Sequence, residues 1–152
     1  MKTESELRSA IIFLLSRRDY SRFEIEQKYS KESDPQILLK LLDDFAAKGY
    51  QSDSRFAGVL VRSKTEQGFG KLRILQDARR KGLAECLVQA AITEESIDWY
   101  ANARMLLERK ISHPIDFKDR KEVEKRLRYL VSRGFSYDEA RYALESAHTE
   151  SE

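Results

Sequence analysis

The sequence has few of the residues that punctuate turns. It contains 6 glycines and 2 prolines among 152 residues. A β-sandwich or β-barrel needs many turns, so this shortage argues against both and in favour of long helices. Leu, Ala, Glu, Lys, Arg and Gln dominate the sequence, and all are good helix formers. The composition therefore predicts an all-α protein.

The chain also has little that would place it outside the cell or in a membrane. Its one cysteine, Cys86, allows no intramolecular disulfide, and we expect it to be a small core residue of a short helix. Met1–Glu6 is polar and acidic, unlike a signal or transit peptide. The longest apolar run, Ala10–Leu15, is far shorter than the roughly 20 residues of a membrane span. These features predict an intracellular protein.

Groups of residues that carry chemistry are also missing. His113 and His148 lie far apart, and neither has a cysteine or an acid at the spacing of metal ligands. Gly68 and Gly70 flank Phe69 without the rest of a nucleotide-binding glycine motif, so a break between helices explains them better. No nucleophile has a base at a suggestive spacing. We expect no catalytic residue, metal or cofactor. A hydrolase or nuclease therefore ranks third among the possible functions, behind the two binding functions considered below.

Local signals mark where helices begin and end. Ser21–Glu24 and Ser136–Glu139 have the spacing of a capping box, and Asp34-Pro35 reads as an N-cap followed by proline at the first helical position. Gly49 is placed to end a helix in the left-handed conformation, with Tyr50 packing back on its last turn. The apolar faces expected from spacings of three and four are Leu7/Ala10/Ile11/Leu14/Leu15, Ile37/Leu38/Leu41/Leu42/Phe45, Phe56/Val59/Leu60, Leu72/Leu75/Ala78, Leu83/Leu87/Ala90/Ala91, Trp99/Ala103/Leu106/Leu107 and Val123/Leu127/Leu130/Val131.

The pattern repeats about every fifty residues. Phe13–Arg18, Gly58–Ser63 and Met105–Lys110 align without gaps, and Tyr20–Ile25 aligns with Phe69–Ile74. One three-helix unit fills each period, and such units bury their apolar faces by stacking on neighbours. We predict repeats at residues 1–50, 51–95 and 96–148 in an elongated, curved array, with a frayed tail at 149–152.

The same residues carry a family likeness. Gly49–Ala57 resembles the central motif of the RecX regulators, in which Gly-Tyr is followed by acidic residues and then Phe-Ala. Ser52 departs from it, standing where the family often has an acid. Further matches follow in the family's order over nearly the whole chain: Arg62–Lys64, Gly68–Gly70, Arg73–Ile74, Lys81–Gly82, Ala103–Arg104, Arg109–Lys110, Lys125, Tyr129–Leu130 and Arg133–Phe135.

The resemblance implies three tandem three-helix repeats and a partner, the RecA recombinase. RecX regulators bind the RecA filament on DNA, block its growth or promote its loss, and so restrain recombination and the SOS response. They are cytoplasmic and have no enzymatic activity. The resemblance thus implies a protein-binding regulator of RecA in DNA repair and recombination.

Two basic segments are candidates for partner binding. Residues 62–81 hold seven basic side chains against two acids. A second group, from Lys118 to Arg128, has spacings of three and four that place it on one helix face, although Glu122 is close enough to neutralise part of it. Either group could instead be a solvated face with local ion pairs. The candidate residues are Arg62, Lys64, Lys71, Arg73, Arg80, Lys81, Lys118, Lys121, Lys125 and Arg128.

The same basic residues allow an alternative function, a helical protein that acts directly on single- or double-stranded DNA. The net charge of only +2 counts against this alternative, because domains that bind DNA through their overall charge are usually much more basic. The RecA filament is therefore the favoured partner, with a weak DNA contact as an accessory.

Overall fold

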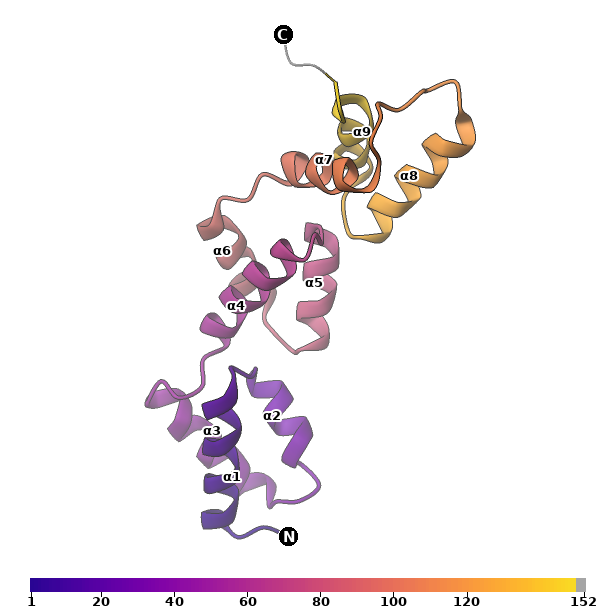
Figure 1. Cartoon of the computed structure of the whole chain (residues 1–152). Helices are drawn as coiled ribbons and strands as arrows, with labels where there is room; N and C mark the ends of the chain where they lie inside the picture. The colour runs from indigo at the N-terminus through magenta and orange to yellow at the C-terminus, as the bar shows by residue number, and fades with distance from the viewer. Residues whose placement is uncertain (150–152) are drawn as a thin grey trace. The chain divides into compact units, whose positions relative to one another are not determined.

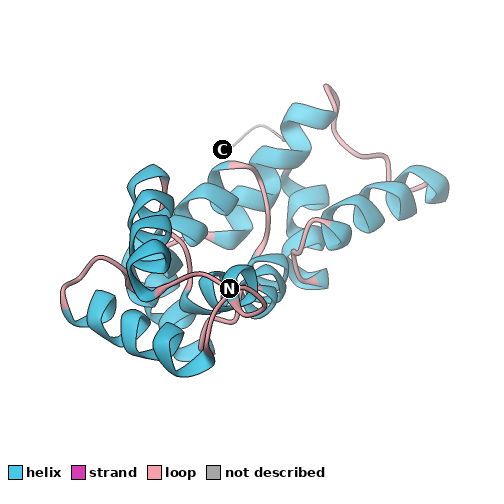
Figure 2. Ribbon diagram, turned by 90° about the horizontal axis from the view of Figure 1, so that it is seen from below, coloured by secondary structure: helices cyan, strands magenta, loops and turns pink. Residues whose placement is uncertain are grey.

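The computed structural model describes residues 1–149 and is all-α. Within that range it contains nine helices and no strand: α1 (Glu4–Arg17), α2 (Arg22–Tyr29), α3 (Pro35–Ala47), α4 (Asp53–Glu66), α5 (Lys71–Arg80), α6 (Glu85–Glu95), α7 (Trp99–Lys110), α8 (Arg120–Ser132) and α9 (Tyr137–Ser146). Figures 1 and 2 show these helices joined by short loops. The all-α fold class is confirmed. None of the described helices is long and apolar enough to cross a membrane.

The helix starts follow from local hydrogen bonding. Ser21 and Ser136 each form the expected capping box, in which the serine hydroxyl accepts the N–H three residues on. Asp34 caps α3 and is followed by Pro35 at the first helical position. The Ser52 hydroxyl likewise accepts the N–H of Arg55, so the departure from the family motif leaves the cap intact.

Helix ends also match the glycine signals. Gly49 has φ +77°, in the left-handed region, and follows the last turn of α3. The ring of Tyr50 lies 6.0 Å from the ring of Phe45, measured between centroids, so the expected packing back on α3 is present.

The helices form two compact units, each described separately. The first holds Met1–Leu60 and Ala78–Ala91, and the second holds Val61–Asp77 and the chain from Ile92 onward. The first has a core on α1, α2 and α3 centred on Leu7, Ile11, Ile25, Leu41, Leu42 and Phe45. In the second, α7 packs against α9 and α8 around Ala103, Leu107, Leu130, Phe135, Ala140, Ala143 and Leu144. Trp99 packs partly buried against this core, as its apolar stripe predicts.

Each unit has a hydrogen bond from the start of a helix to the carbonyl that precedes a helix-ending glycine. In the first unit the Ser21 hydroxyl, at the start of α2, donates to the carbonyl of Lys81 at 2.6 Å. In the second unit the N–H of Gly70, at the start of α5, donates to the carbonyl of Arg133 at 2.8 Å. Ser21 and Gly70 are equivalent in the alignment of the repeats. Aligned positions of the two segments thus make a similar contact, through a side-chain hydroxyl in one and a backbone N–H in the other.

Several apolar faces are rotated from those expected. Val59, Leu72 and Val131 are 39%, 58% and 48% exposed. On α4, Ala57 and Val61 are buried beside Phe56 and Leu60, which turns the inward face away from Val59. On α5 and α8 the inward faces centre on Ile74 and Leu130, and at about 100° per residue Leu72 and Val131 lie outside them.

Helix α6 and the chain end bring two more findings. On α6, Val88 and Ile92 are buried, whereas Cys86 and Ala90 are exposed, so the expected core role of Cys86 is wrong. In the predicted frayed tail, Thr149 bonds to Ser146, and residues 150–152 lie outside the described range. The repeat boundaries stay predictions.

Candidate partner-binding site

Part of the first basic segment is engaged inside the second unit. Lys64 and Arg73 both pair with the buried carboxylate of Asp77, at 3.5 and 3.3 Å. Both cations also lie 5.0 Å from the ring centroid of Phe69, and Arg133 lies 4.0 Å from it. The guanidinium of Arg133 donates to the carbonyl of Gln67 at 2.7 Å. These cations hold α4, α5 and the turn after α8 together, and a partner would have to compete with those contacts.

The rest of that segment divides between the two units. Arg62 pairs with Glu95 at 3.1 Å in the second unit, where Lys71 is half-buried. Arg80 is exposed in the first unit, where Lys81 pairs with Glu24 at 3.1 Å. The structure therefore does not show one continuous basic surface made by residues 62–81.

Glu24 is held in its charged form by these contacts. Burial favours the neutral carboxyl, but a hydrogen bond from the Ser21 N–H and the Lys81 ammonium outweigh it and lower the pKa of Glu24. Lys81 is accordingly part of the contact between neighbouring repeats, and its ammonium is already committed there.

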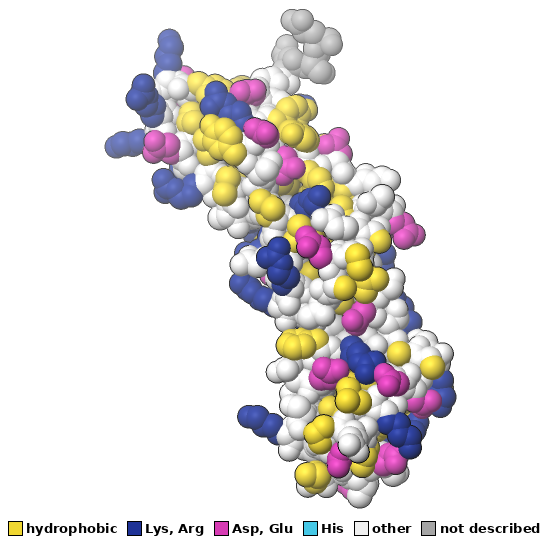
Figure 3. Space-filling model, turned by 180° about the vertical axis from the view of Figure 1, so that it is seen from behind, with side chains coloured by type: hydrophobic (Ala, Val, Ile, Leu, Met, Phe, Trp, Pro, Cys, Tyr) yellow, Lys and Arg dark blue, Asp and Glu magenta, His cyan; other side chains and the backbone are white. Residues whose placement is uncertain are grey.

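The second basic group lies on the outer face of α8. Lys121, Lys125 and Arg128 are exposed and project opposite the buried Leu130. Within residues 1–149 none of the three forms an ion pair. Figure 3 shows Lys and Arg side chains gathered at the upper left, over α8. We call Lys121, Lys125 and Arg128 the α8 cationic face.

Two details of this face differ from the expectation. Lys118 precedes the first residue of α8, and its N–H bonds to the carboxylate of Asp116, so it does not share the helical face. Glu122 pairs with His113 at 2.9 Å and approaches Arg126 at 4.0 Å. Within residues 1–149 its ion pairs are therefore with these two residues and not with Lys121, Lys125 or Arg128.

Helices α7 and α9 of the second unit carry exposed tyrosines. The rings of Tyr100 on α7 and Tyr142 on α9 meet edge to face, 5.5 Å apart, and are 45% and 40% exposed. Arg104 bonds to Glu108, which lowers the pKa of that carboxyl. This surface is aromatic and its charges cancel in pairs.

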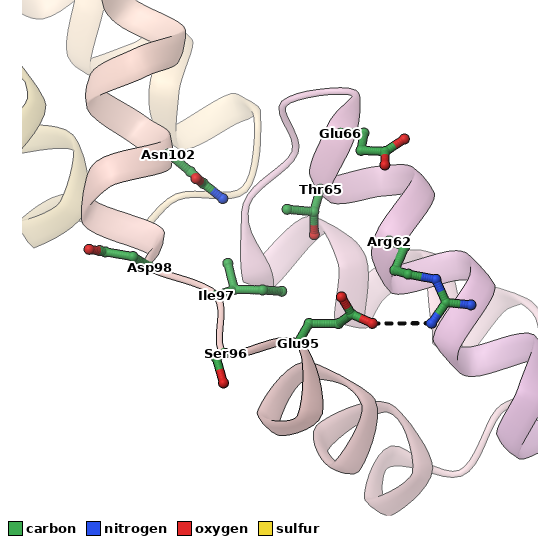
Figure 4. A pocket seen from close by; sticks show the side chains of 8 residues that line it. All are labelled: Arg62, Thr65, Glu66, Glu95, Ser96, Ile97, Asp98 and Asn102. Atoms are coloured by element: carbon green, nitrogen blue, oxygen red, sulfur yellow. Dashed lines mark hydrogen bonds and ion pairs between the residues drawn. The ribbon is translucent and has the colours of Figure 1, made fainter.

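Sequence reasoning missed an open groove between α4 and α7 in the second unit. Figure 4 shows one end of it, where the Arg62–Glu95 pair faces Ile97 and Asn102. This cavity has a volume of about 330 Å³. An adjoining cavity of about 270 Å³ extends it toward Met105. No sequence signal marks this groove, because its walls come from helices of different repeats.

In residues 1–149 no group of three or more His, Cys, Asp or Glu side chains is placed to hold a metal ion. The molecule instead presents charged helix faces and an open groove. Together with the repeated three-helix plan, these features define the class of all-α proteins built from tandem three-helix units.

Comparison with known proteins identifies the family. Residues 52–92 match the model of the second three-helix domain of RecX, and residues 97–144 match the third. The regulatory protein RecX of Halorhodospira halophila is 34% identical over 147 residues, covering 96% of this chain and 91% of the relative. The regulatory protein RecX of Vibrio campbellii is 38% identical over 141 residues, covering 90% and 88%. This chain belongs to the RecX family.

A solved structure shares the fold. The crystal structure of RecX from Lactobacillus salivarius superimposes with a TM-score of 0.78, covering 93% of this chain and 94% of that one, at 20% sequence identity.

Proposed function

We propose that this protein binds the RecA recombinase filament and inhibits its extension and activities, restraining recombination and the SOS response. The observation that carries the proposal is membership of the RecX family across 96% of the chain. The relatives are named regulatory proteins, which supports a role without enzymatic activity. The proposed setting is the cytoplasm, where RecA acts on DNA during repair.

Among the candidate basic residues, we propose that those of the α8 cationic face contribute most to the electrostatic attraction. Lys64 and Arg73 share Asp77, and Lys81 is paired with Glu24. Using these cations for a partner requires breaking an existing ion pair. Lys121, Lys125 and Arg128 need no such exchange, since they have no ion-pair partner within the described chain.

The experiment measures RecA ATP hydrolysis on single-stranded DNA while this protein is titrated in. We expect inhibition at substoichiometric amounts, and no effect at equimolar protein would refute the proposal. A variant with Lys121, Lys125 and Arg128 all changed to Ala is expected to inhibit at least tenfold more weakly.

A control variant removes the same charge elsewhere. Arg17, Lys28 and Lys31 are exposed in the first unit, and their joint replacement by Ala is expected to change inhibition by less than twofold. If both triple variants lose potency equally, only net charge matters and the assignment to α8 is wrong.

The α8 cationic face also favours a second candidate function, direct binding to DNA. Three phosphate contacts would make the logarithm of the affinity fall with the logarithm of salt at a slope of about −2 on single strands. Fluorescence anisotropy with a bare oligonucleotide at several salt concentrations measures this slope. Binding that is absent at physiological salt, or a slope unchanged in the α8 variant, would exclude this function for α8.

A further inference from the structure

We propose that the groove between α4 and α7 holds a segment of a protein partner in which a Lys or Arg side chain lies next to an apolar one. The inference rests on the proposed function, in that the partner is a RecA protomer. The groove would add a contact with this partner that is separate from any contact made by the basic residues of this chain.

The groove is long enough for a segment of chain rather than a single side chain. Its two cavities, of about 330 and 270 Å³, share the walls formed by Thr65, Glu66 and Asn102, and so form one continuous depression. Its second half has an apolar wall. Leu106 is partly buried there, whereas Met105 is 51% exposed. An unbranched methionine adapts to varied apolar partners, which makes this half suited to an apolar side chain.

Glu66 is the charge that best indicates the occupant. It is the last residue of α4, is exposed, and forms no ion pair within residues 1–149. A carboxylate in the last turn of a helix faces the negative end of the helix dipole, which is unfavourable. Glu95 ends α6 in the same unfavourable position, but there Arg62 compensates it. The fold gives Glu66 no comparable compensation, and a cation from a partner would supply it.

The other charges of the groove favour a peptide over a nucleic acid. Around the first cavity the Arg62–Glu95 pair is neutral, which leaves the carboxylates of Glu66 and Asp98, the latter also capping α7 by accepting the N–H of Ala101. The second cavity adds the exposed cation Arg109, so the groove as a whole has a small excess of negative charge, concentrated at the first cavity. That negative end repels a phosphodiester backbone and attracts Lys or Arg. The occupant that we propose is therefore a protein segment in which a basic side chain lies next to an apolar one.

The loop at the first cavity is held in an uncommon conformation. Ser96 has φ +51°, in the left-handed region, which non-glycine residues rarely adopt. Its neighbours Glu95 and Ile97 line the same cavity. An uncommon backbone conformation thus forms part of the wall of the groove, as is frequent at binding sites.

The test compares two charge reversals in the full-length protein. Glu66→Lys removes the groove carboxylate. Glu94→Lys, on the last turn of α6, removes an equally exposed acid that does not line the groove. Both variants change the net charge by the same amount, and both replace an acid by a base at a helix C-terminus, where a base is favoured. Both are therefore expected to fold, with melting temperatures at or slightly above that of the wild type.

The readout is inhibition of RecA ATP hydrolysis on single-stranded DNA, with binding to bare single-stranded DNA measured in parallel. We expect Glu66→Lys to raise the half-inhibitory concentration at least tenfold and Glu94→Lys to change it less than twofold. Equal inhibition by the wild type and Glu66→Lys overturns the groove assignment and leaves the proposed function standing. No inhibition by the wild type overturns both. If Glu66→Lys inhibits normally and binds bare DNA more tightly, the groove faces nucleic acid and the inference is wrong.

Discussion

Replacing Gly70 by alanine should break the contact that joins the second and third repeats. A Cβ at this position would lie 2.5 Å from the carbonyl oxygen of Gly134 and 2.6 Å from the nitrogen of Phe135. Both are backbone atoms, and non-bonded heavy atoms pack at about 3.5 Å, so α5 must move by about 1 Å. The bonds from the Gly70 N–H to Arg133 and from the Leu72 N–H to Gly134, now 2.8 and 3.0 Å, would then exceed hydrogen-bonding distance.

The cost follows from these contacts. Two backbone hydrogen bonds contribute about 1 kcal/mol each, and loosened packing around the buried Phe135 adds a similar amount, for a total of about 3 kcal/mol. In a chain of this size, that lowers the melting temperature by roughly 6–12 °C. The assay is thermal unfolding followed by circular dichroism at 222 nm.

Gly49→Ala is the matched control. Gly49 has φ +77°, but nothing lies within 4 Å of a Cβ built there, so only the left-handed backbone is penalised, by about 1 kcal/mol. Both substitutions remove the same freedom from the unfolded chain. If Gly70→Ala lowers the melting temperature no more than Gly49→Ala does, the close approach of α5 to the turn after α8 does not stabilise the protein as argued.

Two further predictions concern Ser21 and Glu24. In urea titrations, Ser21→Ala should lower the free energy of unfolding by about 2 kcal/mol, because the variant loses both a helix cap and the hydrogen bond to Lys81. Ser136→Ala loses only a helix cap and should lower it by about 1 kcal/mol, and equal losses in the two variants would contradict this reasoning. The pKa of Glu24 is lower in the folded than in the unfolded protein, so its stabilising contribution is present above the unfolded value of about 4.5 and is lost as the pH falls through the folded value. In Glu24→Gln the urea midpoint should therefore fall less on acidification than in the wild type, and parallel curves would refute this.

The sequence predicted best what depends on neighbouring residues. The caps at Ser21, Asp34 and Ser136 were predictable because each needs only a side chain and an N–H two or three positions away. The inward faces were harder, since a small residue such as Ala57 shifts the buried side of α4 away from Val59. The expected curvature of the repeat array stays a prediction.

The candidate site was less predictable, because its geometry depends on contacts between distant segments. The cations Lys64 and Arg73 were found from their charge, but their sharing of Asp77 and Phe69 appears only once α4 and α5 are folded together. The groove at Glu66 needs α7 opposite α4, more than thirty residues away in the chain. The exposed face of α8 was predictable from spacing, apart from Lys118, which lies before the helix begins.

The most direct test of the proposed function is the rate at which RecA filaments extend on single-stranded DNA in the presence of this protein. Fluorescently labelled RecA on tethered DNA reports that rate for individual filaments. The account predicts that extension slows or stops when this protein is present at a small fraction of the RecA concentration. Extension at an unchanged rate with equimolar protein that is folded and helical would contradict it.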